Sequence, residues 1–468
     1  MKKYDVSNYG LVSDGKTLNR DALQKLIDKV HAEGGGDIVF ANGDYVLSTV
    51  YLKDGVRLRV EKDAKILGAM SFYDYDPEEK YEYPLYQDSS HSNFHCSMFV
   101  AENCSNIAIT GNGTIDMRSV WDENDERRIK HRGPKCIALK SCKNIEISGV
   151  DVLNATDIAV YFSDCENVDI HGLNMRVHID GISPDNSRNV KIYDCDIEAG
   201  DDAIAFKSSY NLNKLGSCES IYIRNCKLKS RCNAIKIGTE TNGKFKHIEI
   251  TDVEIRETRF AGLAVESVDG ATVDGIRFSN IVMKNVGTPF FVHLGKRLRG
   301  PAGTKIGEIR NITFENIKAE GPYEPYEAIP WSYDSFKQND TVQEPWKIGR
   351  GEGFNDENEN LKDGPWQITS NVCGLRNHLL KSIIFKNVAL KVSGGAKDYM
   401  REVPETAQSY PEVYVYGRVL PAKGIYFRHA ENVTLENVTV ETYRPDTRED
   451  FVFDDVKVCD VKGKRLFG

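Results

Sequence analysis

The sequence lacks the features that mark membrane proteins, zinc-binding proteins and nucleic-acid-binding proteins. No run of about twenty residues is continuously apolar, as a membrane-spanning helix requires. No two of the 11 cysteines have the CxxC spacing of common zinc sites. The 468 residues carry a net charge of −9, which argues against nucleic acid as the main partner. With 40% hydrophobic and 28% charged residues, the composition is that of a folded globular protein.

The first residues and the cysteines bear on cellular location. The chain begins MKKYDVSNYG, where two lysines are followed at once by polar and aromatic residues instead of the apolar core of a signal peptide. An odd number of cysteines, found at repeat positions such as Cys142, Cys165, Cys195 and Cys226, predicts reduced thiols packed inside the protein. We therefore expect a cytoplasmic protein with neither a membrane nor a nucleic-acid partner.

A short repeat recurs along the chain. Its copies include NCSNIAITG, SCKNIEISGV, DCENVDIHGL, NSRNVKIYDC and HAENVTLENV. Each copy places a small polar residue before a short strand in which apolar residues alternate. Asn144, Asn167 and Asn189 lie 23 and 22 residues apart. This interval is too short for a strand, a helix and a second strand, but it fits one coil of a solenoid.

The repeat predicts an all-β fold, a right-handed parallel β-helix that forms one domain over residues 1–468. About three short strands would make each coil, coils would stack roughly 4.8 Å apart, and stacked asparagines and cysteines would form internal ladders. The ends of a solenoid need capping. We expect an N-terminal cap region over residues 1–60 with a helix over 21–31. The apolar face of that helix comprises Ala22, Leu23, Leu26, Ile27 and Val30.

The repeat lapses between residues 320 and 373. This polar stretch contains three of the four tryptophans, Trp331, Trp346 and Trp366. One interpretation is a surface excursion that packs its aromatic side chains on the flank of the solenoid. The other is a functional loop, because long loops in compact folds often serve function and aromatic faces stack on sugar rings. In that case the loop would close one end of a substrate groove.

Three aspartates fall at related positions of neighbouring repeats. Asp180 and Asp202 each stand thirteen residues after the asparagine that begins their repeat, so they occupy equivalent places on adjacent coils. Asp201 lies beside Asp202, and the next repeat has Asn233 at the equivalent position. The spacing therefore predicts a column of Asp180, Asp202 and Asn233 on one face of the solenoid.

Carboxylates held together in this way suit more than one function. Like charges held close raise the pKa of at least one group, so a cluster supplies both a protonated acid and a carboxylate base. The same residues could hold calcium in a polysaccharide lyase of the β-helix class. A non-catalytic carbohydrate-binding solenoid would not need the cluster, and an epimerase would change a sugar without releasing a new reducing end.

The chain resembles the polygalacturonase-like glycoside hydrolases of family 28, which are right-handed parallel β-helices that act on pectin. The resemblance covers nearly the whole chain, from YDVSNYGLVSDGKTLNRDALQKLID through GNGTIDM. It is most specific at HIDGISPDNSRNV and GDDAIAFKS, which are similar to the family's Asn-Thr-Asp-Gly and Gly-Asp-Asp motifs. It implies Asp201 as the general acid and Asp180 and Asp202 as the bases of an inverting hydrolase, without cofactor or metal.

Two motifs usual in that family are replaced. In place of Gly-His-Gly the chain has CNAIKIGTE, which brings Asn233 and Lys236 to that position. In place of Arg-Ile-Lys, which holds a galacturonate carboxylate in the family, it has GLAVES, with Ala264 and Glu266. Relatives that cleave rhamnogalacturonan also lack these motifs. The substrate we expect is therefore an alternating rhamnose and galacturonate chain, or a neutral or modified sugar.

Substrate-binding residues are expected around the acids. Asn233 and Lys236 are the nearest by register, and Glu240 and Glu266 are candidates for binding sugar hydroxyls. A uronate would need further cations, for which each candidate also has a purely structural interpretation: His178, Arg231, Arg297, Arg299, Arg428 and His429. A cytoplasmic enzyme of this kind would trim imported pectin-derived oligosaccharides from one end, at galacturonate- or rhamnogalacturonan-type bonds.

Overall fold

The computed structural model describes residues 2–87, 89–121, 132–321, 367–396, 398–417, 419–461 and 464–467. These residues form two compact units, an N-terminal unit that ends at Ala203 and a C-terminal unit that begins at Ile204. Trp331, Trp346 and Trp366, on which the two interpretations of the 320–373 stretch depend, lie outside the described residues.

The N-terminal unit consists mainly of short strands, with one α-helix and three short 3-10 helices. The helices are η1 (Val6–Tyr9), α1 (Arg20–Ala32), η2 (Phe72–Asp74) and η3 (Ser89–His91). The strands are β1 (Lys3–Asp5), β2 (Asp14–Leu18), β3 (Gly36–Leu47), β4 (Val50–Tyr51), β5 (Val56–Gly68), β6 (Ser97–Glu102), β7 (Ser105–Gly111), β8 (Thr114–Asp116), β9 (Lys135–Lys140), β10 (Lys143–Ser148), β11 (Asp151–Leu153), β12 (Val160–Ser163), β13 (Glu166–His171), β14 (Asn174–Val177), β15 (Ile182–Asp185), β16 (Arg188–Tyr193) and β17 (Asp196–Ala199).

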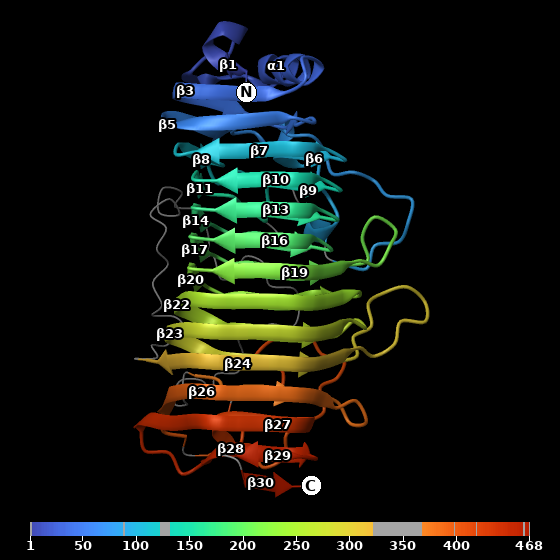
Figure 1. The fold of residues 1–468 in the computed structure, drawn as a ribbon, viewed down its shortest axis with the longest axis vertical. Helices are drawn as coiled ribbons and strands as arrows, with labels where there is room; N and C mark the ends of the chain where they lie inside the picture. Colours follow the sequence, from blue (N-terminus) through green and yellow to red (C-terminus); the bar gives the residue numbers. More distant parts are fainter. Residues whose placement is uncertain are drawn as a thin grey trace. The chain divides into compact units, whose positions relative to one another are not determined.

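Strands of the N-terminal unit pair in parallel with strands one coil away. One sheet contains β4, β6, β9, β12 and β15 in that order. A second contains β5, β7, β10, β13 and β16, and a third contains β5, β8, β11, β14 and β17. The blue to green strands of Figure 1 show this stacking. The prediction of about three short strands in each coil is confirmed.

The asparagines that begin the repeats form a ladder at the surface. Side-chain amides join Asn106 to Asn144, Asn144 to Asn167 and Asn167 to Asn189 at 3.0, 3.0 and 3.2 Å. All four have φ between 53° and 57°, in the left-handed region that asparagine tolerates at turns. The ladder was predicted inside, and that part is wrong, because the left-handed turn directs these side chains outward.

The cysteine ladder is internal as predicted. The backbone N–H of Cys104 donates to the sulfur of Cys142 at 3.4 Å, and the N–H of Cys142 donates to the sulfur of Cys165 at 3.4 Å. All eleven cysteines are free thiols, and ten of them are buried. Cys232 is half-buried. The sulfur atoms therefore act as small apolar core groups that also satisfy backbone donors.

The helix expected over 21–31 is α1 (Arg20–Ala32). Leu23, Leu26, Ile27 and Val30 are buried, whereas Ala22 is half-buried. Gln24 fixes the helix to β4 through both ends of its amide, at 2.8 and 3.1 Å from the backbone of Tyr51. Figure 1 shows α1 beside β1 at the N-terminal end of its unit. No helix among the described residues is long and apolar enough to span a bilayer.

The C-terminal unit continues the parallel pattern with longer strands. Its strands are β18 (Ile204–Ser208), β19 (Ser217–Arg224), β20 (Lys227–Ser230), β21 (Ile235–Thr241), β22 (Lys244–Ser267), β23 (Thr272–Leu294), β24 (Glu308–Glu320), β25 (Ser370–Cys373), β26 (Leu380–Gly394), β27 (Ala422–Arg444), β28 (Glu449–Val456), β29 (Cys459–Val461) and β30 (Lys464–Phe467). One sheet contains β18, β21, β22, β23, β25, β27 and β28.

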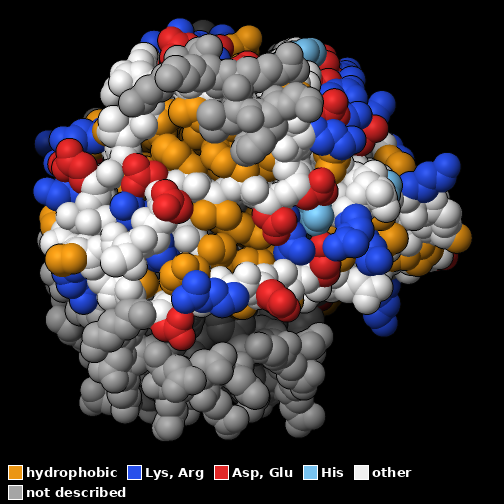
Figure 2. Space-filling view, turned by 90° about the horizontal axis from the view of Figure 1, so that it is seen from below, with side chains coloured by type: hydrophobic (Ala, Val, Ile, Leu, Met, Phe, Trp, Pro, Cys, Tyr) orange, Lys and Arg blue, Asp and Glu red, His pale blue; other side chains and the backbone are white. Residues whose placement is uncertain are grey.

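Aromatic side chains stack through the core of the C-terminal unit. The rings of Phe278 and Phe314 are 5.1 Å apart, and those of Phe314 and Phe385 are 4.6 Å apart. Burial of each such ring contributes roughly 1.5–3 kcal/mol. The last strands, β29 and β30, pair antiparallel and so end the parallel stack. Figure 2 shows this end, with apolar side chains at its centre and charged side chains around them.

Candidate active site

The three predicted catalytic aspartates lie together on adjacent coils of the N-terminal unit, and we refer to Asp180, Asp201 and Asp202 as the acidic cluster. Asp180 stands between β14 and β15, and Asp201 and Asp202 follow β17 one coil later. The backbone N–H of Asp202 donates to Oδ1 of Asp180 at 3.2 Å, and the N–H of Gly181 donates to the carbonyl of Asp202 at 3.0 Å. The predicted equivalence of Asp180 and Asp202 is confirmed.

The three aspartates differ in exposure. Asp180 and Asp202 are each 4% exposed, and Oδ2 of Asp180 also accepts a hydrogen bond from Ser183 at 3.1 Å. Asp201 is half-buried, and its N–H donates to the carbonyl of Ile179 at 3.3 Å. Asp180 is therefore held rigidly by two side-chain hydrogen bonds, whereas the Asp201 side chain is the most accessible of the three.

Arg132 was not identified from the sequence and lies beside these acids. Its Nη1 donates to Oδ1 of Asp157 at 2.8 Å and to the hydroxyl of Ser90 at 2.5 Å. Burial lowers the pKa of Arg132, but the charges of Asp157, Asp201 and Asp180 outweigh that effect and raise it. The guanidinium therefore stays charged within the field of two of the predicted catalytic residues.

Asp157 orients this cation. It stands on the coil next to Asp180, where the N–H of Ala159 donates to the carbonyl of Asp180 at 2.9 Å. The other carboxylate oxygen of Asp157 lies 3.3 Å from the ammonium of Lys135, which is fully buried and also donates to Asn93 at 2.7 Å. Burial raises the pKa of Asp157, but Lys135 and Arg132 more than offset it, so the net direction is down. Asp157 is therefore an ionised anchor.

His178 belongs to the same unit and is neutral. Burial lowers the pKa of His178 to about 3. Its Nε2 lies 3.0 Å from the hydroxyl of Ser119. Because its side chain is uncharged at neutral pH, His178 does not supply a cation for a uronate.

Lys236 and Asn233, both in the C-terminal unit, have structural partners. The ammonium of Lys236 lies 2.8 Å from Glu412 and 3.7 Å from Glu266, and all three side chains are buried. Oδ1 of Asn233 accepts the N–H of Ala261 at 2.9 Å, as Asp180 does with the N–H of Asp202. The positive charge of Lys236 is therefore balanced by two carboxylates of the protein itself.

Glu240 also lies in an ion-pair network of the C-terminal unit. One carboxylate oxygen is 3.3 Å from the ammonium of Lys207 and the other is 3.5 Å from the guanidinium of Arg299. Arg297 forms a two-armed ion pair with Asp269, in which Nε is 2.9 Å from Oδ1. The predicted cations Arg297 and Arg299 are therefore both paired with acids.

Arg428 and His429 hold a segment of the chain that covers the C-terminal unit. Arg428 donates to the carbonyls of Val403 and Pro404 at 2.8 and 3.2 Å and pairs with Glu405 at 3.0 Å. His429 also contacts Glu405, at 2.8 Å. Arg428, predicted as a substrate ligand, thus uses its donors on the protein. We refer to residues 398–417 as the covering segment.

The covering segment packs on the part of the sheet where GLAVES replaces the family motif Arg-Ile-Lys. Ala264 on β22 is fully buried in an apolar cluster with Val413 of the covering segment. The other buried members of this cluster are Phe260, Ala261, Phe291 and Ile368. The segment also supplies Glu412, the partner of Lys236. The covering segment therefore occupies the surface of the sheet at Ala264 and Lys236.

The buried side chain of His293 makes the stability of this region depend on pH. It is fully buried beneath the covering segment, with Nδ1 2.8 Å from the hydroxyl of Tyr416, and burial lowers its pKa to about 3. The unfolded chain therefore binds the proton first as pH falls, and stability is lost below about pH 6.5. We expect His293 to contribute about 2 kcal/mol of destabilisation between pH 7 and pH 5. Urea unfolding at both pH values should show that His293→Gln lacks this increment, and an equal loss in both proteins would contradict it.

One further group in the N-terminal unit has the composition of a metal site. Glu79, His95 and Glu102 place ligand atoms within 4.8 Å of one another. However, Lys140 pairs with Glu102 and lies 3.9 Å from Glu79, and both oxygens of Glu79 accept the N–H of Phe94. This group is an ion-pair network that already contains its own cation.

The sequence was compared with protein families and with known proteins. The family described as Glycosyl hydrolases family 28 matches residues 43–325. A probable polygalacturonase from Vitis vinifera is 27% identical over 262 residues, which cover 53% of each chain. An endo-polygalacturonase from Pectobacterium carotovorum subsp. carotovorum is 27% identical over 246 residues, covering 48% of this chain and 59% of that protein. The chain thus spans little more than half the length of these relatives.

The fold comparison agrees with the sequence comparison. The exopolygalacturonase from Thermotoga maritima superposes with a TM-score of 0.64 at 16% identity, covering 99% of this chain and 93% of that one. The likeness establishes the fold, an all-β solenoid whose parallel sheets close around an axis. Because the family match covers more than half of the sequence, the chain belongs to the glycosyl hydrolases family 28.

Proposed function

We propose that the protein is an inverting glycoside hydrolase that acts on pectin-derived oligosaccharides. The observation that carries this proposal is the contact between Asp180 and Asp202, with Asp201 beside them, in a chain of the glycosyl hydrolases family 28. Acidic side chains held on adjacent coils provide the acid and the base that single-displacement hydrolysis requires.

The different exposures of the aspartates support their assigned roles. Asp201, the most accessible, protonates the leaving glycosidic oxygen. Asp180 and Asp202 are buried and fixed to each other, so they position and deprotonate the attacking water. The separation of acid and base in inverting enzymes leaves room for that water, which attacks the opposite face of the sugar. The product then has the inverted anomeric configuration.

The covering segment supports removal of sugars from one end of the substrate. Val413 and Glu412 fill the surface over Ala264 and Lys236 in the C-terminal unit, so a polymer cannot lie across that part of the sheet. The name of the Thermotoga maritima structure, an exopolygalacturonase, is in keeping with this mode of action. We propose exo-action on galacturonate- or rhamnogalacturonan-type bonds.

The free cysteines support a cytoplasmic location. None of the eleven forms a disulfide, as is usual for proteins kept in a reducing compartment. Imported oligosaccharides would be the substrates there. We also propose that the coils wind in the right-handed sense that parallel strand connections almost always take, with α1 as the N-terminal cap.

A screen of defined pectic oligosaccharides tests the proposed function. The protein is incubated with oligogalacturonides and rhamnogalacturonan fragments of several lengths, and the products and their anomeric configuration are followed in time. We expect saturated products, inversion, one sugar released per event and retention of activity in chelator. Unsaturated products that need calcium would identify a lyase instead. Random internal cleavage would contradict exo-action but leave the hydrolase assignment intact.

A further inference from the structure

Among the described residues of the N-terminal unit, Arg132 is the accessible cation beside the catalytic aspartates. Arg132 retains 15% of its side-chain exposure, whereas Lys135 has none and His178 is neutral. Among the described residues, Asp157 and Ser90 bind only Nη1 of Arg132, and Nε is buried without a hydrogen-bond partner. Arg132 therefore has donors left over after its structural contacts are made.

Two of the cations predicted from the sequence, Lys236 and Arg428, are used within the C-terminal unit. Lys236 is balanced by Glu266 and Glu412, and Arg428 by Glu405 and backbone carbonyls. Ala264 and Glu266 replace the family's two basic residues. A substrate that carries carboxylates still needs a positive charge close to the catalytic acids, because the carboxylates of Asp180 and Asp202 would otherwise repel it.

We propose that Arg132 binds the carboxylate of a galacturonate residue held at the acidic cluster, and that it sets the preference for acidic over neutral sugars. Asp157 and Ser90 fix one side of the guanidinium, which leaves Nη2 to face the substrate. A planar guanidinium oriented in advance binds carboxylates better than a flexible ammonium does. This inference rests on the proposed hydrolase function.

A pair of substrates that differ only in charge tests the role of Arg132. One is an oligogalacturonide and the other is the same oligosaccharide with its carboxyl groups reduced to alcohols. For Arg132→Gln we expect kcat/KM on the acidic substrate to fall roughly 10- to 100-fold, mostly through KM, with a much smaller change on the reduced substrate. Arg132→Lys should recover part of the loss, because it keeps the charge.

Arg188→Gln is the matched control. The Arg188 side chain is 59% exposed and pairs with Glu166 at 2.9 Å in the same unit, so its loss should change neither rate. If Arg132→Gln lowers kcat/KM for both substrates by the same factor, or lowers it for neither, the assignment is wrong. Arg132 then serves only to hold Asp157. If Arg132→Gln does not fold, the ratio of kcat/KM on the acidic substrate to kcat/KM on the reduced substrate is measured for Arg132→Lys and decides in the same way. Wild-type protein that cleaves neither substrate contradicts the proposed function instead.

Discussion

Asp202→Asn should lower kcat for oligosaccharide hydrolysis by roughly 10²- to 10⁴-fold while the protein stays folded. The substitution keeps the shape of the side chain and the backbone N–H that Asp180 accepts, so the local hydrogen bonds survive. What is lost is the negative charge that takes a proton from the attacking water. Release of reducing ends over time measures the loss, and thermal unfolding checks the fold.

Asp196→Asn is the control for that experiment. Asp196 lies on β17 just before the acidic pair, and its carboxylate is 34% exposed and 3.0 Å from Arg176. Ion pairs of this exposure contribute little, so the control should keep nearly wild-type activity and stability. Asp202→Asn protein that retains wild-type turnover would show that the carboxylate of Asp202 is not the base of the reaction.

The parallel coils were predictable because one local requirement repeats in sequence. Asn144, Asn167 and Asn189 each adopt a left-handed backbone conformation at the second residue of a strand, and few residues do so without strain. Their interval therefore sets the coil length. Whether the asparagine side chains face the interior or the solvent was not predictable from the interval. A residue with left-handed backbone conformation interrupts the alternation of inward- and outward-facing side chains along a strand.

The same coil length explains which parts of the site could be predicted. Asp180 and Asp202 are one coil apart, so register alone brings them together. Arg132 meets Ser90 across 42 residues, and Lys236 meets Glu412 across 176. Such contacts depend on how excursions from the coils fold back. The sequence held only an indirect signal for Arg132. Asp157 lies one repeat before Asp180, and a buried carboxylate there needs a positively charged partner, but the sequence does not show which residue supplies it.

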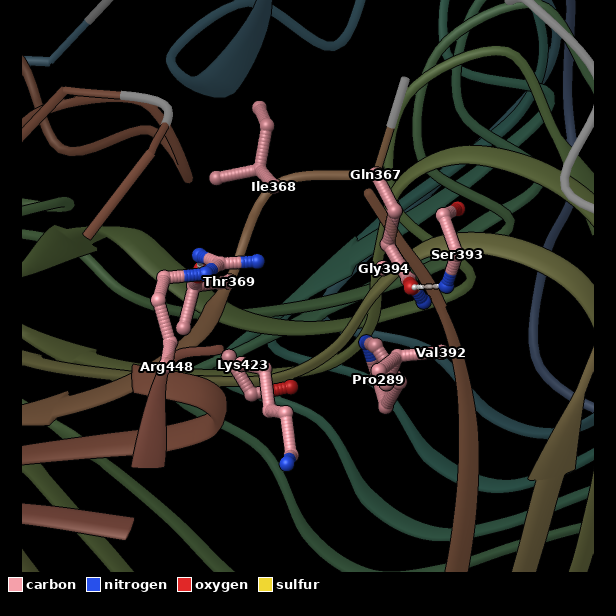
Figure 3. A pocket seen from close by; sticks show the side chains of 10 residues that line it. Pro289, Gln367, Ile368, Thr369, Val392, Ser393, Gly394, Lys423 and Arg448 are labelled. Carbon is pink, nitrogen blue, oxygen red and sulfur yellow. Dashed lines mark hydrogen bonds between the residues drawn. The ribbon is translucent and has the colours of Figure 1, made fainter. Parts of the chain in front are cut away.

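A buried ion pair between Arg448 and Asp446 lies where the chain that follows the covering segment rejoins the sheet. Arg448 is 6% exposed, and its Nη1 donates to the carbonyls of Leu420 and Ala422 at 2.9 and 3.0 Å. Its other nitrogens bind the fully buried carboxylate of Asp446. Arg448 also lines a small pocket with Thr369, Ser393 and Lys423 (Figure 3). The guanidinium thus satisfies a buried anion and two carbonyls at once.

We expect Arg448→Met to lower the free energy of unfolding by roughly 3–5 kcal/mol at pH 7, because it leaves Asp446 as an uncompensated buried charge. Burial raises the pKa of Asp446, and Arg448 reverses that effect and holds it below its usual range. Without the arginine, Asp446 takes up a proton on acidification, so the deficit should shrink between pH 7 and pH 4. Urea unfolding of Arg448→Met at both pH values measures this change.

Arg444→Met, at an exposed position of β27, should leave stability within about 0.5 kcal/mol of wild type. A deficit in Arg448→Met as small as this would mean that the ion pair does not anchor the covering segment. A large deficit that stays constant with pH would place the cost in the lost carbonyl contacts of Leu420 and Ala422 instead of in the charge of Asp446. In the first case the segment must be held chiefly by Val413 and its apolar neighbours, and exo-action would then depend on packing at Ala264 and not on the ion pair.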